Sequence, residues 1–260
     1  MKPFQFNNKT RTLFIAVIYI AFTIFSIYNI VKAPQISSKI FYACLLIVAL
    51  SIAIYAEYLR TIYQKCIQTL TIDCDPLKAD QQFKALLKKD IFKAYNKTYL
   101  IFQTLYYADM LDPKNCLNTL EKDEKFFHSS LDMLLVYHYT KFYANFLLNN
   151  LEEVKNEYSH LTKLKGAKIK GDKVAPLYNY EFIDSIYQFA LKKYKQSLNC
   201  FKSINTKNMN PRELLHYHYQ LQALYLKLHQ PSAAKVHQKE IIKIGGTTKI
   251  WKEIHLYENE

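Results

Sequence analysis

Glycine is scarce in this sequence, with four residues in a chain of 260. All four fall in two breaks, Gly166 and Gly171 in the basic stretch KGAKIKGDK and the adjacent pair Gly245 and Gly246, and this distribution supports a chain made of helices. No Gly-rich phosphate loop, HExxH motif or GxSxG motif occurs. Nucleotide sites and recognised metal or hydrolase sites are therefore unsupported.

Cysteine and histidine also fail to form a recognisable site. The five cysteines are Cys44, Cys66, Cys74, Cys116 and Cys200. They include no CxxC pair, and their odd number agrees with a reducing compartment. His216 and His218 would point about 200° apart on a helix, and His128 and His138 lack an acid or cysteine at ligand spacing. The sequence predicts no catalytic, metal-binding or cofactor-binding residue, although a catalytic cysteine with a distant histidine stays open.

Charge is nearly absent from two long apolar runs near the N-terminus. Leu13–Val31 contains no Asp, Glu, Lys or Arg, and Ile40–Tyr58 contains only Glu57, next to its end. About 20 apolar residues at 1.5 Å per residue span a hydrocarbon core of about 30 Å. Both runs are therefore predicted to be transmembrane helices within residues 1–60. The alternatives are a buried core helix for either run and a signal peptide for the first, but no small-x-small cleavage pattern follows Val31.

The connector between the two runs predicts their orientation. Lys32–Lys39 is so short that the predicted helices are antiparallel neighbours, and the chain ends then lie on one side of the membrane. The flanking cations are Lys2, Lys9 and Arg11 before the first run and Arg60, Lys65 and Lys78 after the second, against Lys32 and Lys39 in the connector. Because cytoplasmic segments carry the excess of cations, we expect a two-pass protein of the cell membrane with both termini in the cytoplasm.

The remaining chain, from about Glu57, shows helical periodicity with little strict alternation of the strand kind. Helix starts are predicted at Asp75-Pro76, Asp112-Pro113 and Asn210-Pro211, because each pairs a side-chain acceptor at the N-cap with proline at the first helical position. Glu213 completes a capping box at the third start. The predicted fold class is all-α.

An internal repeat organises this helical part, since a long helix, a tight turn and a shorter helix recur four times. The turns lie near Leu111-Asp112, Asn149-Asn150, Lys192-Lys193 and His229-Gln230. Three equivalent positions follow each turn: Pro113, Leu151, Tyr194 and Pro231; then Cys116, Val154, Ser197 and Ala234; then Leu120, Tyr158, Phe201 and Gln238. The small residue followed by a large one suits two closely packed helices, with the large side chain covering the next turn.

The stretches LLNNLEEVKNEYSHL and LKKYKQSLNCFKSI resemble the turn and second helix of the tetratricopeptide repeat. The repeat spacing of roughly 37 to 43 residues exceeds the usual 34, and the consensus Trp, Leu-Gly and Pro positions are mostly not met. The resemblance covers about Ile91 to Ile244. It implies a TPR-like α-solenoid of helix-turn-helix pairs over residues 91–260, behind a basic juxtamembrane helical linker at residues 61–90. The whole layout, ending in GGTTKIWKEI, is also similar to small uncharacterised two-helix-anchored membrane proteins of low-GC Gram-positive bacteria.

Tetratricopeptide-like arrays bind peptides or helices of partner proteins in a concave groove formed by the first helix of each pair. Carried over position by position, the resemblance places Tyr139, Tyr143, Asn179, Phe182, His216 and Tyr219 on that groove. The alternative is that these side chains serve ordinary core or inter-repeat packing. The 22 tyrosines do not decide between the two, because tyrosine serves core, interface and headgroup region alike.

The chain is strongly basic, with 35 Lys and Arg against 22 Asp and Glu and a net charge of +13. Four lysines near the membrane end of the soluble part, Lys84, Lys88, Lys89 and Lys93, are candidates for contact with anionic lipid headgroups at about 1 kcal/mol each. The alternative is a solvated, generally basic surface. Nucleic-acid binding is disfavoured, because no recognised motif accompanies the charge.

These observations together predict a membrane-anchored adaptor or scaffold whose cytoplasmic helical domain binds a protein partner. Two alternatives remain open. One is an enzyme or effector-controlled regulator with an unrecognised site, and the other is a subunit of a larger membrane complex assembled through the predicted hairpin.

Overall fold

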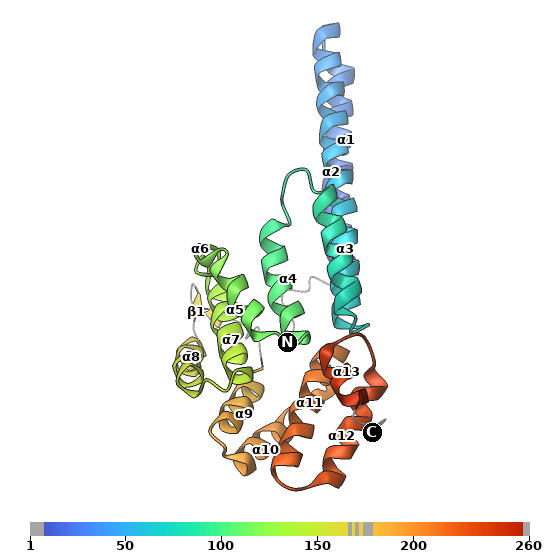
Figure 1. Ribbon diagram of the computed structural model, residues 1–260. Helices are drawn as coiled ribbons and strands as arrows, with labels where there is room; N and C mark the ends of the chain where they lie inside the picture. Colours follow the sequence, from blue (N-terminus) through green and yellow to red (C-terminus); the bar gives the residue numbers. More distant parts are fainter. Residues whose placement is uncertain (1–7, 166–167, 170–171, 174–178, 257–260) are drawn as a thin grey trace. The chain divides into compact units, whose positions relative to one another are not determined.

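The structure, a computed structural model, describes residues 8–165, 168–169, 172–173 and 179–256 (Figure 1). These residues are helical apart from one antiparallel pair of two-residue strands, β1 (Lys168–Ile169) and β2 (Asp172–Lys173). The predicted all-α fold class is confirmed at this level. Gly166 and Gly171, which were expected to break the helices, lie outside the described residues.

The chain forms two compact units, Lys2–Tyr63 and Gln64–Glu260. The first unit contains helix α1 (Asn8–Lys32) and most of helix α2 (Ile36–Thr71). Only Ala33–Gln35 separate the two helices, fewer residues than the predicted connector. Both apolar runs of the sequence are therefore helical, and each helix extends beyond the run that predicted it.

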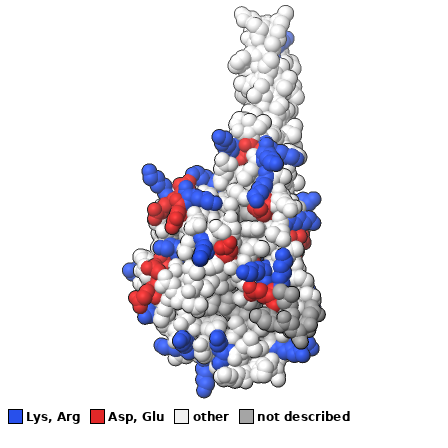
Figure 2. Space-filling model, in the orientation of Figure 1, with Lys and Arg blue, Asp and Glu red and all other residues white. Residues whose placement is uncertain are grey.

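Helix α2 is the one helix of the described chain that is both long and apolar enough to cross a membrane. Its most apolar 18-residue window contains no buried residue, and Ile47 and Ile54 are 64% and 70% exposed. The face seen in Figure 2 carries almost no charge over this unit. In α1 the apolar stretch Val17–Lys32 is shorter than 18 residues. One candidate span is thus found where the sequence predicted two.

Residues 61–90, which were expected to form a basic juxtamembrane helical linker, lie mostly in two helices. Helix α2 continues to Thr71, and from Gln64 onward the chain belongs to the second unit. Cys66 and Leu70 of α2 and Phe83 of helix α3 (Pro76–Lys89) are fully buried. From Gln64 onward, this segment therefore contributes buried side chains to the second unit.

Four pairs of neighbouring helices form most of the second unit (Figure 1). They are α4 (Asn96–Asp109) with α5 (Pro113–Glu121), α7 (Leu131–Leu147) with α8 (Leu151–Leu164), α9 (Tyr180–Ala190) with α10 (Tyr194–Ser203), and α11 (Pro211–Lys227) with α12 (Pro231–Ile244). The short helices α6 (Glu124–Phe127), η1 (Thr206–Asn208) and α13 (Lys249–Leu256) complete the unit. This pairing is compatible with the expected helix-turn-helix repeats.

The four predicted turns join the members of these pairs. Leu111, Asn149, Lys192 and His229 have φ angles of 47°, 57°, 59° and 56°. At each turn the following residue donates its backbone N–H to a carbonyl five residues earlier, at 2.9 Å, which is the hydrogen bond of a Schellman motif. A left-handed conformation costs a non-glycine residue about 1–2 kcal/mol. Packing between the paired helices must offset this cost, since no glycine occupies any of the four positions.

The second helix of each pair begins at the predicted residue, and the small position that follows packs tightly. Cys116, Val154, Ser197 and Ala234 are at most 3% exposed. The Cys116 thiol donates to the Thr104 carbonyl (3.7 Å), and the Ser197 hydroxyl donates to the Ser185 carbonyl (2.8 Å). Both acceptors lie 12 residues earlier on the first helix, so the small side chain rests against its backbone. The large position is less uniform, because Leu120 and Phe201 are buried whereas Tyr158 and Gln238 are half-buried.

The predicted helix caps are confirmed. Asp75 and Asp112 each accept the backbone N–H three residues further on, at 3.0 and 3.1 Å. Asn210 and Glu213 form the reciprocal capping box, with both hydrogen bonds at 2.9 Å. The sequence therefore specified these three helix starts through local hydrogen bonding alone.

The loop after α12 connects the end of the second unit to its beginning. Gly245 and Gly246 have φ angles of 75° and 94°, and Thr247 donates its backbone N–H to the Cys74 carbonyl (3.0 Å) and its hydroxyl to Asp75 (2.6 Å). A Cβ on Gly246 would lie 2.1 Å from the Cys74 carbonyl oxygen. Only glycine fits this close approach, so the Gly-Gly pair ties the loop to the turn between α2 and α3.

Candidate functional site

A cavity of about 830 Å³ lies within the second unit. Its lining comes mainly from α4, α7, α11 and the start of α9, which are the first helices of the four pairs. Five of the six residues predicted for a partner groove line it, namely Tyr139, Tyr143, Asn179, Phe182 and His216. Tyr219 does not line it and packs against Leu215, Ile241 and Ile250 instead, because it faces helices α12 and α13.

The aromatic side chains of the cavity wall also serve packing. The rings of Tyr139 and Tyr143 are parallel with centroids 6.3 Å apart, and Phe182 meets Phe201 edge-on at 5.6 Å. Burial raises the pKa of Tyr139 to about 12 and that of Tyr143 well above its ordinary value. Both phenols are therefore protonated at neutral pH. Asn179 caps α9 by accepting the backbone N–H of Phe182 (3.1 Å).

A buried polar network forms one side of the cavity. Asp109, the last residue of α4, is 0% exposed. Its carboxylate accepts a hydrogen bond from Arg212 Nε at 2.8 Å and lies 2.7 Å from His216 Nε2. His216 Nδ1 lies 3.3 Å from the Tyr143 hydroxyl, which in turn accepts from Gln220 Nε2 at 3.3 Å. The network joins α4, α7 and α11 over as many as 107 residues of sequence. We refer to these five residues as the Asp109 network.

One protonation pattern satisfies every hydrogen bond of the Asp109 network. Burial by itself would raise the pKa of Asp109, but the Arg212 charge and the His216 hydrogen bond lower it, so the carboxylate is ionised. Burial lowers the pKa of His216 despite the opposing effect of Asp109, so the ring is neutral at pH 7. A neutral His216 with its proton on Nε2 donates to Asp109 and accepts from the Tyr143 hydroxyl. The charge of Asp109 is thus balanced by Arg212.

The network resembles an acid–histidine–hydroxyl relay in geometry but not in reactivity. A nucleophile in such a relay needs a hydroxyl or thiol that loses its proton readily. The hydroxyl here belongs to Tyr143, whose pKa is raised. The thiols at Cys74 and Cys116 are buried, and burial raises the pKa of each to about 12. The arrangement is suited to holding the cavity wall in one conformation rather than to nucleophilic catalysis.

Four of the remaining histidines form two clusters. His218 Nδ1 lies 2.9 Å from His237 Nδ1 of α12, and we call these two residues the histidine pair. Burial lowers the pKa of both, that of His237 to about 4 with a further contribution from His218. His216 and His218 therefore contact different helices, as their spacing predicted. Among the described residues, no group of three or more His, Cys, Asp or Glu side chains is arranged to hold a metal ion.

His138 belongs to the second cluster, which contains an acid that lies far from it in the sequence. Its Nδ1 lies 2.6 Å from Glu157, an acid 19 residues away on α8, and Lys141 pairs with the same carboxylate at 2.8 Å. The His160 ring stacks on that of His138 with centroids 4.5 Å apart. Spacing along the chain did not indicate this contact because the turn between α7 and α8 brings the two residues together. Because Lys141 forms an ion pair with Glu157, the carboxylate keeps a charged partner, which explains why it can be buried.

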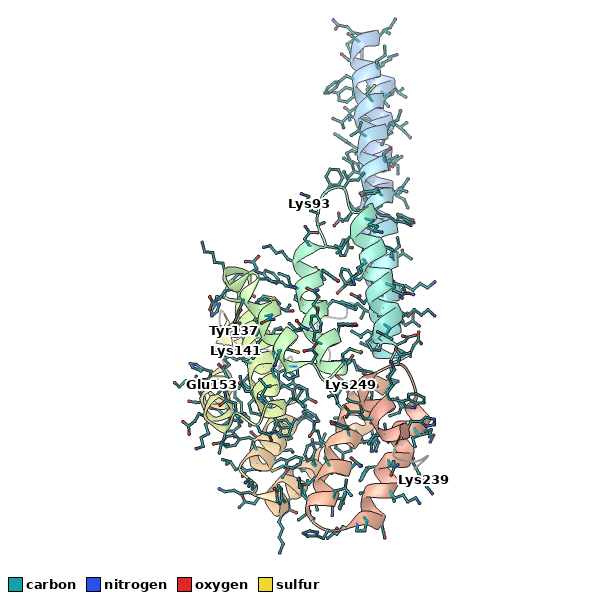
Figure 3. All side chains as sticks on the ribbon, in the orientation of Figure 1. Lys93, Tyr137, Lys141, Glu153, Lys239 and Lys249 are labelled. Atoms are coloured by element: carbon teal, nitrogen blue, oxygen red, sulfur yellow. The ribbon has the colours of Figure 1, made fainter. Side chains whose placement is uncertain are left out.

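The four lysines predicted for lipid contact do not form one group. Lys84 pairs with Asp80 at 2.6 Å, and this hydrogen bond raises the pKa of Lys84. Lys88 and Lys89 lie in the last turn of α3, and Lys93 lies on the loop that joins α3 to α4 (Figure 3). Three of the four are therefore close in sequence at one end of α3. Lys84 is set apart from them by its ion pair.

No protein-family model, no curated protein and no solved structure matches this chain.

Proposed function

We propose that this protein is a membrane-anchored adaptor whose helical unit binds a segment of a protein partner in the central cavity. One observation carries the proposal. Five of the side chains that the sequence predicts for a partner groove line a single cavity, which the first helices of the four pairs form. A volume of about 830 Å³ suits one short segment, with apolar and aromatic side chains providing most of the contact. The Asp109 network would hold the wall in a preorganised state, which reduces the entropic cost of binding.

We further propose a two-pass anchor with both termini in the cytoplasm. The support is that α1 is a helix of 25 residues, about 37 Å at 1.5 Å per residue, and that three residues connect it to the candidate span α2. The predicted first run, Leu13–Val31, lies wholly within α1. A tag placed at either terminus should be digested by protease in inverted membrane vesicles and protected in right-side-out vesicles. Protection of one tag in each preparation would contradict the topology.

The cavity assignment can be tested by filling the cavity. Ala108 lines it from α4 and is half-buried, whereas Ala233 is half-buried on α12 and does not line it. The intact chain should retain one stoichiometric partner after extraction in mild detergent. We expect Ala108→Trp to lower partner recovery about tenfold, a loss of about 1.4 kcal/mol of binding, while Ala233→Trp retains it. Equal recovery with both variants, each with an unchanged melting temperature, would remove the cavity from the proposal.

A small-molecule effector is the second candidate, favoured by the same cavity volume. Sites for small ligands typically enclose about 300–1,000 Å³ and combine apolar walls with a few polar groups. Native mass spectrometry of the purified chain distinguishes the candidates. A bound molecule of low mass that is absent from Ala108→Trp would favour the effector-controlled regulator over the adaptor.

The third candidate is a subunit of a larger membrane complex, in which the apolar helices carry the contact. Replacing residues 1–60 by an unrelated two-helix anchor separates this case from the cavity. Partner recovery that survives the replacement assigns binding to the second unit, and recovery that disappears assigns it to the anchor.

A further inference from the structure

The loop between α3 and α4 exposes the two most solvent-accessible large apolar side chains of the second unit among the residues described. Ile91 is 78% exposed and Phe92 is 70% exposed. Large apolar side chains exposed side by side mark contact surfaces more often than isolated ones do. The cavity and its lining residues do not include this loop, so it requires its own explanation.

A buried acid shapes the loop. Asp90, which is 5% exposed, caps the end of α3 and accepts the backbone N–H of Tyr95 at 2.7 Å. The Asp90 carbonyl accepts the backbone N–H of Lys93 at 3.2 Å, and Lys93 has a φ angle of 55°. These hydrogen bonds connect Asp90, at the start of the loop, to Lys93 and Tyr95 near its end. The apolar pair is therefore displayed at the apex of an ordered turn.

Basic side chains flank the apolar pair in sequence on both sides. Lys88 and Lys89 precede it and Lys93 follows it, and Figure 3 places Lys93 on this loop. The nearest acid, Asp90, points inward and is buried. An apolar tip with lysines around it is complementary to an anionic bilayer surface, in which apolar groups enter the interface and ammonium groups meet phosphate oxygens. A protein surface would have to supply both an apolar pocket and surrounding acids.

We propose that the loop Asp90–Tyr95 is an interfacial membrane contact, in which Ile91 and Phe92 insert among the lipids and Lys88, Lys89 and Lys93 bind anionic headgroups. The contact is separate from the cavity. It attaches the chain to the membrane at a second place, in addition to the apolar helices. Its effect is to fix the second unit against the membrane surface. Membrane anchoring by α1 and α2 is tested independently, by flotation of the intact chain with vesicles.

A tryptophan reporter tests the contact in the full chain. The sequence contains a single tryptophan, Trp251, whose ring stacks on His255, so Trp251→Phe gives a silent background that retains an aromatic ring. Phe92→Trp in that background places the reporter in the loop. Val236→Trp is the matched control, because Val236 is 59% exposed on α12. Lys239, on the same helix, lies at the opposite end of the second unit from Lys93 (Figure 3).

Both reporters are reconstituted into vesicles of zwitterionic lipid with and without anionic lipid, each containing brominated chains. We expect the loop reporter to emit at shorter wavelength and to be quenched by the brominated lipid, more strongly with anionic lipid present. Changing Lys88, Lys89 and Lys93 together to glutamate should remove the dependence on anionic lipid. The control reporter should be quenched only by aqueous acrylamide.

Two results would overturn the proposal. The first is a loop reporter that is as accessible to acrylamide as the control in vesicles that carry the floated chain, which would assign the loop to solvent or to a protein surface. The second is lipid quenching that is the same with and without anionic lipid and is unaffected by the three glutamates. That outcome would remove the lysines from the contact.

Discussion

Removing the Asp109 carboxylate tests whether the Asp109 network stabilises the second unit. In Asp109→Ala the Arg212 guanidinium keeps its charge but loses its partner at 2.8 Å, and the His216 Nε2–H loses its acceptor at 2.7 Å. Breaking one side of a buried ion pair costs about 3–5 kcal/mol, because the remaining charge stays in a poorly solvating environment. For a unit of this size, 1 kcal/mol corresponds to about 2–4 °C in melting temperature. We therefore expect a decrease of about 6–20 °C.

The measurement is thermal unfolding of the detergent-solubilised full chain, followed by circular dichroism. Glu121→Ala is the matched control, because Glu121 is an exposed acid on α5 and its removal should change the free energy of unfolding by less than about 0.5 kcal/mol. Arg212→Ala completes a double-mutant cycle, in which the double variant should lose less stability than the two single variants together. A decrease for Asp109→Ala no larger than that for Glu121→Ala would refute the buried ion pair.

Three further predictions concern the turns, the helix pairs and pH. Gly246→Ala should lower the free energy of unfolding by about 2–4 kcal/mol in chemical denaturation, because its Cβ would lie 2.1 Å from a carbonyl oxygen. Gly245→Ala should cost only the backbone strain at a φ of 75° and a ψ of −147°, about 1–3 kcal/mol, because nothing lies within 4 Å of its Cβ. Ala234→Leu should lower the free energy of unfolding by about 1–3 kcal/mol, because the larger side chain overpacks the buried position. Val236→Leu, at an exposed position of the same helix, should leave the free energy of unfolding unchanged in the same assay, and equal effects of the two substitutions would contradict the close packing. The histidine pair has lowered pKa values, that of His237 about 4, so the unfolded chain takes up protons before the folded chain as the pH falls from 6.5. Stability should therefore fall between pH 6.5 and about 4, for His237 by somewhat less than about 1.4 kcal/mol per pH unit because the ring is partly solvent-screened, and His237→Phe should flatten the profile.

Local chemistry explains why the sequence predicted the helical elements well. The caps at Asp75, Asp112 and Asn210 depend on hydrogen bonds within four residues, which the sequence specifies directly. The paired helices were visible because small residues recur at a fixed distance after each turn. The end of α2 was missed because no helix-breaking residue follows Tyr58 until Pro76, and a membrane boundary need not end a helix.

The candidate site was predicted only where repeat geometry fixes the direction of a side chain. Tyr139, Phe182 and His216 occupy equivalent positions on first helices and line the cavity. Their direction could be predicted because residues three to four apart lie on the same face of a helix. Tyr219 lies outside the cavity lining and packs against the cluster that α12 and α13 form, because α13 follows the last pair and offers an apolar surface there. The position of a residue within a repeat does not predict its contacts with a helix that lies outside the repeats, such as α13.

The sequence by itself determined that the chain is helical, where the paired helices turn and that the N-terminal helices are apolar, since these properties depend on residues close together along the chain. Only the tertiary structure decided that Asp109 meets Arg212 and His216, that Glu157 meets His138, and that Gly246 must lack a side chain. Those contacts join residues as many as 107 positions apart in the hydrogen-bonded pairs and still farther apart at Gly246. Their formation depends on how the helix pairs stack, which no local pattern encodes.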